Sequence, residues 1–528
     1  MRLATVAQIL ARHQLLVGAA DLDLPDLEIT AIKTDSRAVT PGSLFIAIAG
    51  LQYDGHDFIN QAIQNGAAAI VCEKPVHIPV PTLTVVNSRQ ASAILSAFWW
   101  GNPADDLICI GVTGTNGKTT TSFMIDAILE EAGYTTGIIG TIITKIGHRL
   151  TESKMTTPDP WDLAHLLHHL VEQQAEVVTM EVSSHAITQD RCFGLAFQIG
   201  ILTNISPDHF DLHSGLNEYI QAKADFFKLV DPQGRTLANG DDPLVRQALA
   251  VGSAQNPIFF GLSSDCQIRG EDLVINSTGS SFTLLWNDLT GIGGNPIPAD
   301  SLLVSLKMPG RHNVYNAIAA AATGLLLGIR PTVIKRALAT FSGVARRLQY
   351  IYQGDVSIID DFAHNPASLQ AAIAACSPLA SRQLILVHAI RGNRGVSINR
   401  QNAEAIAASI KQKNLPVKCI LTASEDVVTE QDRVSPDEKQ VFFDTFQQAK
   451  VPYRYYPKLR HALDSALASA ARGDVILLLG AQGMNAGNRL FHQIAADHPQ
   501  IAIADPYDEL SSEPAIIAIP DYLQLTSH

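Results

Sequence analysis

A glycine-rich stretch, residues 111–120, constrains this 528-residue chain more than any other feature. It reads Gly-Val-Thr-Gly-Thr-Asn-Gly-Lys-Thr-Thr. The apolar, β-branched run Leu107–Val112 leads into it and predicts a buried strand, and apolar residues at helical spacing follow over Thr119–Ala132. A loop in this position directs backbone N–H groups and a helix N-terminus at one point, where a phosphate group is stabilised. The sequence therefore predicts an α/β fold that binds ATP.

The residue types within the loop support this prediction. Lys118 and the Thr119 hydroxyl can reach phosphate oxygens and Mg²⁺. Val112 stands where the general P-loop pattern has its first glycine, so the match is to the shorter Gly-Thr-Asn-Gly-Lys-Thr form. Taken alone, the loop leaves open a second interpretation, in which its glycines serve only a tight turn. The expected nucleotide contacts are Gly114, Thr115, Asn116, Gly117, Lys118, Thr119 and Thr120.

Length and composition narrow the class of protein. A chain of 528 residues exceeds one hydrophobic core and predicts two to four domains. Its 46% hydrophobic and 17% charged residues are typical of a soluble globular protein. The net charge of −13 argues against a nucleic-acid-binding surface, although a local basic pocket for an anionic substrate stays compatible with it.

Cysteine usage and hydropathy indicate a cytoplasmic protein. The six cysteines are scattered without a Cys-x-x-Cys pair, so neither a disulfide framework nor a zinc site is expected, and a reducing compartment is favoured. The most apolar long stretch, Val314–Ile329, is interrupted by Asn316 and is too short to span a bilayer. No targeting or membrane segment is therefore predicted.

Breaks in the residue pattern divide the chain into three predicted domains. A helical pattern over Ala91–Trp100 stops at Asn102-Pro103, which places a boundary within residues 101–106. A second change of composition occurs around Phe341-Ser342-Gly343. From about residue 497 the chain is rich in Asp, Glu, Pro and Ser, which predicts a surface extension. The predicted domains are residues 1–105, 106–342 and 343–528.

The second predicted domain alternates strands with helices. Such alternation implies a mainly parallel sheet whose ligand site lies at the carboxyl ends of the strands. Lys118, Thr119, Glu181 and His209 fall at such ends. Glu181, His209 and the Thr119 hydroxyl form a plausible Mg²⁺ shell around a triphosphate. Glu181 or His209 alone would more simply be a capping or buried polar residue. The predicted elements are strands Leu107–Val112, Val177–Val182 and Gln198–Thr203 and helices Trp161–Gln174 and Leu216–Leu229.

The two flanking domains carry weaker patterns. The N-terminal part starts with a predicted helix, Thr5–Leu16, and then carries Asp35-Ser36-Arg37 and Asp54-Gly55-His56, which fit either an anion or nucleobase pocket or a solvated hairpin. The third domain alternates again and predicts a second parallel α/β unit. Its predicted strands are Ser357–Asp360, Leu384–Val387, Cys419–Thr422 and Val475–Leu479, and its helices lie near Ser368–Cys376, Asn402–Gln412, Lys439–Gln448 and His461–Ala471.

Five motifs in order resemble the Mur ligase superfamily, and most of all its MurE type, the UDP-N-acetylmuramoyl-tripeptide synthetases. The resemblance implies three domains: a nucleotide-sugar-binding N-terminal domain, a central P-loop ATPase domain and a C-terminal Rossmann-like domain. It also implies a monomer that joins an amino acid to a UDP-N-acetylmuramoyl-peptide through an acyl phosphate in peptidoglycan precursor synthesis. The motifs are Gly114–Thr120, Thr156–Asp159, Met180–Ala186, Thr203-Asn204 leading into Asp208-His209, and Tyr219–Lys223 followed by Phe226-Phe227.

The resemblance also implies roles for individual residues. Lys118, Glu181, His209 and Lys223 match the catalytic positions, and Lys223 matches a lysine that is carbamylated to become an oxygen ligand. The implied metal ligands are Thr119, Glu181, His209 and Lys223. Beyond the glycine-rich loop, the implied nucleotide contacts are Asn313, which matches an adenine contact, Arg347, Asp361 and His364. The implied substrate contacts are Ser36, Arg37 and His56 for UDP, and Thr156, Thr157, Ser184, Gln189 and Arg191 for the muramoyl-peptide.

The departures from the family pattern all fall in the third domain. Residues 422–427 replace an Asp-Asn-Pro-Arg segment, residues 481–485 replace Gly-Lys-Gly-His-Glu, and residues 388–395 replace a glycine-rich loop. Loss of the glutamate argues against a standard diaminopimelate site. Arg391 and Arg394 could hold an acceptor carboxylate or could be solvated. Two alternatives stay open: a cyanophycin-synthetase-like or secondary-metabolite ligase acting on another acyl substrate, and a weakly catalytic binding or regulatory protein.

Overall fold

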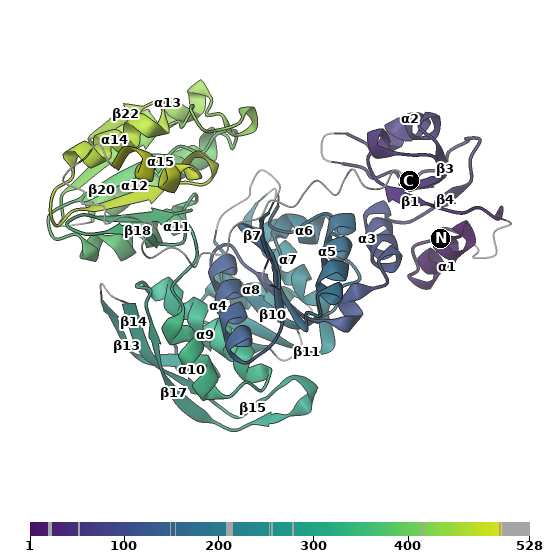
Figure 1. Cartoon of the computed structure of the whole chain (residues 1–528), viewed down its shortest axis with the longest axis horizontal. Helices are drawn as coiled ribbons and strands as arrows, with labels where there is room; N and C mark the ends of the chain where they lie inside the picture. The colour runs from purple at the N-terminus through teal and green to yellow at the C-terminus, as the bar shows by residue number, and fades with distance from the viewer. Residues whose placement is uncertain are drawn as a thin grey trace.

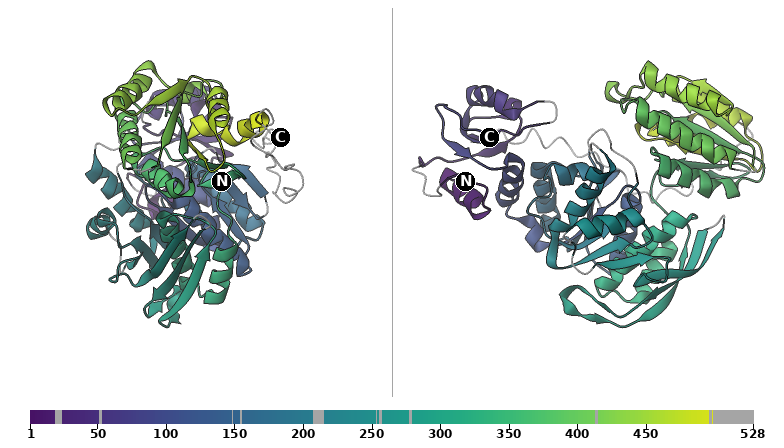
Figure 2. Two further views of the ribbon diagram at one scale, coloured as in Figure 1. Left: turned by 90° about the vertical axis from the view of Figure 1, so that its left-hand side faces the viewer. Right: turned by 180° about the vertical axis from the view of Figure 1, so that it is seen from behind.

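Three sheets follow one another along the chain. The computed structural model describes residues 1–18, 24–50, 53–147, 149–153, 155–206, 215–252, 254, 257–276, 279–412, 415–495 and 498. Within these residues the sheets have four, eleven and six strands, with a two-stranded ribbon beside the second. Figure 1 shows the N-terminal and C-terminal sheets at opposite ends of the molecule, with the large sheet between them, and the reverse view of Figure 2 agrees. Most of the surface extension expected from residue 497 lies outside the described residues.

The N-terminal sheet is parallel throughout, in the order β1-β2-β3-β4. Helix α1 begins at Leu3 and ends at Arg12, four residues before the predicted end at Leu16. It ends there because Gln14 adopts φ +58°, a left-handed conformation that breaks the helix. The elements are α1 (Leu3–Arg12), β1 (Ala31–Lys33), β2 (Ser43–Ile46), α2 (Ile59–Gln64), β3 (Ala67–Cys72), β4 (Thr82–Thr84) and α3 (Ser88–Trp99).

The central sheet has the order β17-β14-β13-β12-β11-β10-β5-β9-β6-β7-β8. Its middle strands, from β13 to β6, pair in parallel, as the strand–helix alternation predicts. Antiparallel strands extend both edges, and the sequence pattern did not predict them. The strands are β5 (Ile108–Thr113), β6 (Thr136–Ile139), β7 (Ile143–Ile146), β8 (Arg149–Glu152), β9 (Val177–Glu181), β10 (Phe197–Leu202), β11 (Val230–Asn239), β12 (Ile258–Gly261), β13 (Ile268–Asn276), β14 (Gly279–Trp286), β17 (Asp300–Leu306) and the ribbon strands β15 (Leu289–Thr290) and β16 (Pro296–Ile297).

Helices cover both faces of the central sheet. Apolar residues of α4, α9 and α10 pack in one core cluster, and those of α5, α7 and α8 pack in another. Helix α9 is buried on nearly all sides, which is why its sequence is apolar all round. Among the helices of the described ranges, none is long and apolar enough to cross a bilayer. The helices are α4 (Lys118–Glu131), α5 (Pro160–Glu172), α6 (Ser184–Thr188), α7 (Leu216–Asp225), α8 (Pro243–Val251), α9 (Arg311–Leu326) and α10 (Pro331–Thr340).

The C-terminal sheet has the order β18-β19-β23-β20-β21-β22, and only β18 pairs antiparallel. Helix α12 begins six residues before its predicted start, because its first turns are polar and hide the helical pattern. The elements are β18 (Gln349–Gln353), β19 (Ser357–Asp361), α11 (Pro366–Cys376), β20 (Leu384–Ala389), α12 (Val396–Lys411), β21 (Val417–Thr422), α13 (Pro436–Gln448), β22 (Tyr453–Tyr456), α14 (Leu459–Ser469), β23 (Val475–Leu479) and α15 (Gly487–Ala495).

A buried histidine in β20 makes the stability of this fold depend on pH. His388 is 1% exposed and lies 5.3 Å from the Phe442 ring, and its ring nitrogens have no hydrogen-bond partner among the described residues. Burial lowers the pKa of His388 from 6.5 to about 3. As the pH falls, the unfolded chain therefore binds a proton at His388 before the folded chain does. The stabilisation is present above pH 6.5 and is lost as pH falls towards 3, by about 1.4 kcal/mol per pH unit.

The substitution His388→Met is expected to remove this part of the acid sensitivity, because methionine is apolar and cannot be protonated. Wild type should lose about 2 kcal/mol between pH 6.5 and pH 5 through His388 alone. Thermal unfolding of both proteins at pH 7 and pH 5 checks this, and the fall in Tm should be smaller for the variant. Equal falls in Tm would show that His388 does not titrate as its burial requires.

Candidate active site

The glycine-rich loop joins β5 to α4 and has the backbone shape that phosphate binding needs. Gly114 and Gly117 adopt φ +142° and +87°, a region that residues with a Cβ rarely enter. A Cβ on Gly117 would meet Asn316 Oδ1 at 2.5 Å. Lys118 is the first residue of α4, and its Nζ donates to the carbonyl oxygens of Gly114 (2.9 Å) and Thr115 (3.0 Å). The lysine cation therefore lies over the loop, at the N-terminus of the helix.

The loop is held in place from the end of β10. Asn204 Oδ1 accepts from the Asn116 N–H (2.9 Å), and Asn204 Nδ2 donates to the Asn116 carbonyl (2.8 Å). The Thr203 hydroxyl donates to the same carbonyl at 2.6 Å. The sequence motifs include Thr203 and Asn204 without indicating a function for them, and these contacts give them one. They fix the phosphate loop against the neighbouring strand.

Glu181, at the end of β9, places its carboxylate against the first turn of α4. Its side chain is fully buried and accepts from the Thr119 hydroxyl at 3.0 Å. Thr141 also donates to it, through its hydroxyl (2.8 Å) and its backbone N–H (2.9 Å). Sequence reasoning missed Thr141, because nothing in the sequence pairs the β6–β7 turn with β9. Three donors thus hold the Glu181 carboxylate beside Thr119.

The oxygen atoms around Glu181 suit a hard cation. A carboxylate and a threonine hydroxyl are the protein ligands that Mg²⁺ takes alongside phosphate and water. In the described part of the chain, no group of three or more His, Cys, Asp or Glu side chains forms a metal cluster. His209, the other predicted metal ligand of this shell, lies outside the described residues. Thr119 and Glu181 therefore fit as two ligands of a Mg²⁺ ion, and a nucleotide phosphate would supply further ligands.

Lys223 of α7 lies beneath the start of the loop. It is 1% exposed, and its Nζ donates to the Thr113 hydroxyl (3.0 Å) and the Gly114 carbonyl (3.2 Å). The ammonium also lies 5.4 Å from the centre of the Tyr219 ring. Lys223 is therefore a buried residue of α7 and not an exposed helical lysine. Its carbamylation stays a prediction.

A cavity of about 330 Å³ lies between the central and C-terminal sheets. Asn116, Gly117, Thr120 and Asn313 line it from the central side. Arg347 and Asp361, together with residues of α11, line it from the other side. Six of the predicted nucleotide contacts therefore share one cavity next to the glycine-rich loop. Its position suits the base and sugar of a nucleotide whose phosphates reach the loop.

The segment before and after β19 links the two sheets. Arg347 Nη2 donates to the Thr119 hydroxyl at 3.1 Å. Burial raises the pKa of Asp361, which accepts from the backbone N–H groups of Leu348 and Ala363, both at 2.8 Å. His364 Nδ1 lies 2.8 Å from the Phe362 carbonyl oxygen. Arg347 therefore touches the predicted phosphate site directly, whereas Asp361 shapes the turn that carries His364.

A pair of amide side chains also connects the glycine-rich loop to the C-terminal part of the chain. Asn365 Nδ2 donates to Asn116 Oδ1 (3.2 Å), and Asn116 Nδ2 donates to Asn365 Oδ1 (3.5 Å). Asn365 is 2% exposed and also caps α11, since its Oδ1 accepts from the Ser368 N–H. Sequence reasoning gave Asn365 no function. The contact joins the glycine-rich loop to the C-terminal sheet.

The substitution Asn365→Ser is expected to raise KM for ATP by about three- to tenfold, because it removes the amide contact to Asn116 but keeps a capping oxygen for α11. Phosphate release measured over a range of ATP concentrations tests this. Tm should change little, which separates the contact from the helix cap. A KM equal to that of wild type would show that the amide pair does not help to hold the nucleotide site closed.

The predicted muramoyl-peptide contacts gather next to Glu181. The Thr157 hydroxyl donates to the Glu181 carbonyl (2.8 Å), and the Thr141 hydroxyl, which donates to Glu181, lies 3.2 Å from the Thr156 hydroxyl. Arg191 donates to the Thr157 carbonyl (2.8 Å) and to Gln189 Oε1 (2.8 Å). The buried hydroxyl of Ser184 has no partner among the described residues. Three of these five residues, Thr157, Gln189 and Arg191, are joined by hydrogen bonds to Glu181 or to each other. Thr156 is linked to Glu181 through Thr141, and Ser184 begins α6 just beyond β9.

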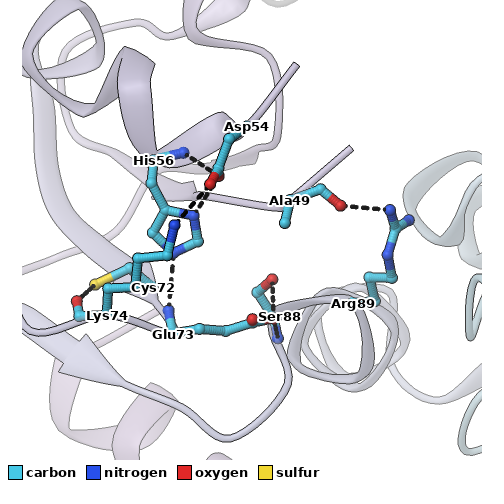
Figure 3. Close-up of polar contacts among 8 residues, drawn as sticks. All are labelled: Ala49, Asp54, His56, Cys72, Glu73, Lys74, Ser88 and Arg89. Atoms are coloured by element: carbon cyan, nitrogen blue, oxygen red, sulfur yellow. Dashed lines mark hydrogen bonds and ion pairs between the residues drawn. The ribbon is translucent and has the colours of Figure 1, made fainter. Parts of the chain in front are cut away.

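The predicted UDP contacts lie apart from this cluster, in the N-terminal part of the chain (Figure 1), where Ser36 and Arg37 follow β1 and His56 lies just before α2. The Ser36 hydroxyl donates to Gln61 (2.9 Å), and the exposed Arg37 pairs with Asp35 (2.8 Å). Figure 3 shows His56 between Asp54 and the backbone of Glu73, with Nδ1 2.6 Å from Asp54 Oδ1 and Nε2 accepting at 3.0 Å.

Asp54 is fixed by its neighbours. Lys74 Nζ lies 2.7 Å from Asp54 Oδ2 and, together with His56, holds the pKa of that carboxyl well below its usual value. Both ring nitrogens of His56 are engaged within the chain, so in this conformation His56 shapes the loop. The predicted contact of His56 with UDP stays a prediction.

Comparison with known proteins gives the family. Three family models match successive parts of the chain: the Mur ligase family catalytic domain over residues 28–97, the Mur ligase middle domain over 112–324, and the Mur ligase glutamate ligase domain over 346–482. The UDP-N-acetylmuramoyl-L-alanyl-D-glutamate–2,6-diaminopimelate ligase of Bacillus velezensis is 33% identical over 468 residues, which are 87% of this chain and 90% of the relative. The enzyme of the same name from Geobacillus thermodenitrificans is 34% identical over 466 residues, 86% and 90% of the two chains.

Solved structures share the fold. MurF from Acinetobacter baumannii aligns with a TM-score of 0.63 at 21% identity and covers 93% of this chain and 98% of its own. MurF from Thermotoga maritima in complex with ADP aligns with a TM-score of 0.60 at 18% identity, covering 90% and 100%. The predicted three-part Mur ligase architecture is therefore confirmed. The chain belongs to the Mur ligase family of ATP-dependent ligases.

Proposed function

We propose that this enzyme joins an amino acid to the carboxylate of a UDP-N-acetylmuramoyl-peptide, with cleavage of ATP to ADP and phosphate, in peptidoglycan precursor synthesis. One observation carries the proposal. Glu181 contacts the phosphate loop through its carboxylate and Thr119, and contacts the predicted peptide-binding cluster through its backbone and Thr157. A triphosphate on the loop and a carboxylate donor in the cluster would therefore lie side by side.

The chemistry follows from this neighbourhood. A carboxylate is a poor acyl donor because oxide is a poor leaving group. An oxygen of the donor carboxylate attacks the γ-phosphorus, and ADP leaves with the bridging oxygen. The amine of the acceptor then attacks the acyl carbon, and phosphate leaves from the tetrahedral intermediate. Lys118, over the loop, offsets the repulsion between the carboxylate and the γ-phosphate, which is catalysis by position and charge.

Mg²⁺ is proposed as the metal. Thr119 and Glu181 would hold it, with His209 and a carbamylated Lys223 as the further ligands of the prediction. When bound, Mg²⁺ supplies positive charge to the phosphate oxygens. Thr141 supports the proposed metal site, because its two hydrogen bonds keep the Glu181 carboxylate aimed at Thr119.

Closure of the C-terminal part over the loop is proposed to exclude water, since an exposed acyl phosphate hydrolyses. The contacts from Arg347 to Thr119 and from Asn365 to Asn116 support this. The proposed domains are residues 1–105, 106–342 and 343–528. The protein is further proposed to act as a monomer in the cytoplasm, where ATP and nucleotide-sugar precursors are available.

Phosphate release tests the proposal. The full chain is incubated with ATP, Mg²⁺, UDP-N-acetylmuramoyl-dipeptide and a panel of amino acids, and product masses are measured in parallel. Release that needs both the dipeptide and an amino acid, with a product heavier by one amino-acid residue, is expected. If the protein bound ATP but released no phosphate with any of the amino acids, the proposal would be contradicted and another acyl substrate would be favoured.

A further inference from the structure

A second cavity, of about 220 Å³, lies where the N-terminal part of the chain meets the central sheet. Helices α1, α3 and α5 line it together with the segment 191–195, and Figure 1 shows these three helices next to one another. The nucleotide cavity and this one share no lining residue, so the two are separate. No step of the proposed reaction uses this space.

The interior of this cavity is apolar. Water in an apolar space makes few hydrogen bonds, so an apolar group that displaces it binds favourably, and apolar cavities of about this size take up small apolar molecules. The volume corresponds to about seven water molecules of the liquid, which is room for a molecule of roughly ten non-hydrogen atoms. The apolar walls include Ile9, Ile94, Ala97, Leu163, Leu167 and Phe193.

Two charges of opposite sign stand at the opening of the cavity. Arg12 is the last residue of α1, and Asp105 lies in the short turn Pro103–Asp106 before β5. Both side chains line the cavity and are exposed, as is His13 beside Arg12. Neither Arg12 nor Asp105 makes a side-chain hydrogen bond or an ion pair with a residue of the described ranges. Because a guanidinium binds a carboxylate and a carboxylate binds an ammonium group, this opening suits a ligand that carries both charges.

The cavity wall also carries a residue of the predicted substrate cluster. Arg191 lines the cavity, and its guanidinium donates to the Thr157 carbonyl at 2.8 Å. The preceding residue, Asp190, accepts from the side chains of Asn87 (3.0 Å), which caps α3, and Gln90 (3.4 Å) of the same helix. A ligand that fills the space between α3 and α5 therefore acts on the segment that carries Arg191.

We propose that this cavity binds a small apolar amino acid, with its carboxylate at Arg12, its ammonium group at Asp105 and its side chain in the apolar interior. The bound amino acid acts on the donor-substrate site through the segment that carries Arg191. It is an effector and not the acceptor of the reaction, because no residue of the phosphate loop lines the cavity. Its binding is independent of the function proposed above, and only its effect on the donor site rests on that function.

Tryptophan fluorescence of the full chain reports on this site. Three of the four tryptophans gather beside the cavity, Trp99 and Trp100 at the end of α3 and Trp161 at the start of α5. The ring centres of Trp99 and Trp100 lie 5.9 and 5.5 Å from that of Trp161. The fourth, Trp286, lies in β14, and no tryptophan follows it in the sequence. Binding of an amino acid to the C-terminal sheet therefore leaves this signal unchanged.

Leucine, whose branched side chain fits the interior in size and polarity, is the test ligand and is expected to change the fluorescence saturably. 4-Methylpentanoate, which lacks the ammonium group, and 3-methylbutylamine, which lacks the carboxylate, should each bind about three- to tenfold more weakly. Glycine, which lacks the apolar side chain, should bind at least about tenfold more weakly. Absence of a saturable change up to about 20 mM leucine, or equal binding of 4-methylpentanoate, would overturn the proposal.

Matched variants locate the two charges of the ligand. Arg12→Gln and Asp105→Asn should each weaken leucine binding about three- to tenfold at an unchanged Tm, because both side chains are exposed. Arg2→Gln, just before α1, and Asp106→Asn, an exposed neighbour that does not line the cavity, are the controls and should bind leucine like wild type. Wild-type affinity in both Arg12→Gln and Asp105→Asn would contradict the assignment.

The single-charge ligand sharpens this test. The affinity for 4-methylpentanoate should fall in Arg12→Gln and should not fall in Asp105→Asn, because this ligand has no ammonium group for the carboxylate to bind. A loss of affinity in Asp105→Asn equal to the loss for leucine would show that Asp105 does not bind the ammonium group.

Calorimetry tests the effect on the donor site. The Kd for UDP-N-acetylmuramoyl-dipeptide, measured on the full chain without ATP, is expected to change at least about threefold when leucine is saturating, and the Kd for leucine should change by the same factor when the dipeptide is bound. Ala97→Leu, which fills the interior, should abolish the change. An unchanged Kd for the dipeptide in wild type would overturn the effect on the donor site. If the dipeptide did not bind at all, the function proposed above would be contradicted, whereas leucine binding to the cavity would stand.

Discussion

Replacing Glu181 with glutamine is expected to lower kcat by about a hundred- to a thousandfold with the fold intact. Glutamine has nearly the same shape and keeps one oxygen, which can accept from the hydroxyls of Thr119 and Thr141, while its amide nitrogen replaces the oxygen that accepts from the Thr141 N–H. What the variant loses is the negative charge beside the phosphate loop, on which the proposed Mg²⁺ binding depends. The concentration of Mg²⁺ needed for half-maximal activity should therefore rise as well.

Steady-state phosphate release over a series of Mg²⁺ concentrations measures both effects. Glu172→Gln, an exposed carboxylate of α5 whose contacts are surface histidines, serves as the control and should match wild type. If Glu181→Gln kept a kcat within about threefold of wild type, Glu181 would be a buried structural carboxylate and not part of the reaction.

Replacing Lys118 with methionine is expected to lower kcat by a similar factor, about a hundred- to a thousandfold, and to raise the Kd for ATP. Methionine keeps most of the length of the side chain and removes only its charge and its donors. In the free protein the ammonium lies over the loop, on the carbonyl oxygens of Gly114 and Thr115. The same position places it against a bound triphosphate, where charge compensation is largest.

ATP binding by calorimetry, combined with single-turnover phosphate release, separates the two expected effects. Lys228→Met removes an exposed lysine that pairs with Asp225 and is the control for a change of net charge. A Lys118→Met protein that binds ATP more weakly but turns over normally when saturated would contradict a role of Lys118 in the chemical step.

The sequence predicted those parts of the fold and site that depend on short stretches. The strand–loop–helix at residues 107–132 is set by local hydrophobic pattern and glycine conformation, and it forms as predicted. Parallel pairing of β5, β9 and β10 brings their carboxyl ends together, and this is why Thr119 and Glu181 meet. The antiparallel strands at the edges of the central sheet were not predicted, because their pairing depends on contacts between distant segments.

The parts that escaped prediction depend on partners far apart in sequence. Thr141 acquires its place only because β6 pairs with β9, and Asn365 acquires its place only when the C-terminal part meets the phosphate loop. Glu438 gives no sign in the sequence that it caps the loop at residues 393–395. The predicted role of His209 cannot be compared with the structure, because this residue lies outside the described ranges.

The most direct test of the account follows the oxygen atoms. UDP-N-acetylmuramoyl-dipeptide is prepared with ¹⁸O in the carboxylate that becomes the amide, and the released phosphate is analysed by mass spectrometry after one turnover. An acyl-phosphate mechanism transfers one labelled oxygen to phosphate and leaves the other in the amide product. Unlabelled phosphate would mean that water attacks ATP, and it would contradict activation of the carboxylate beside Lys118 and Glu181.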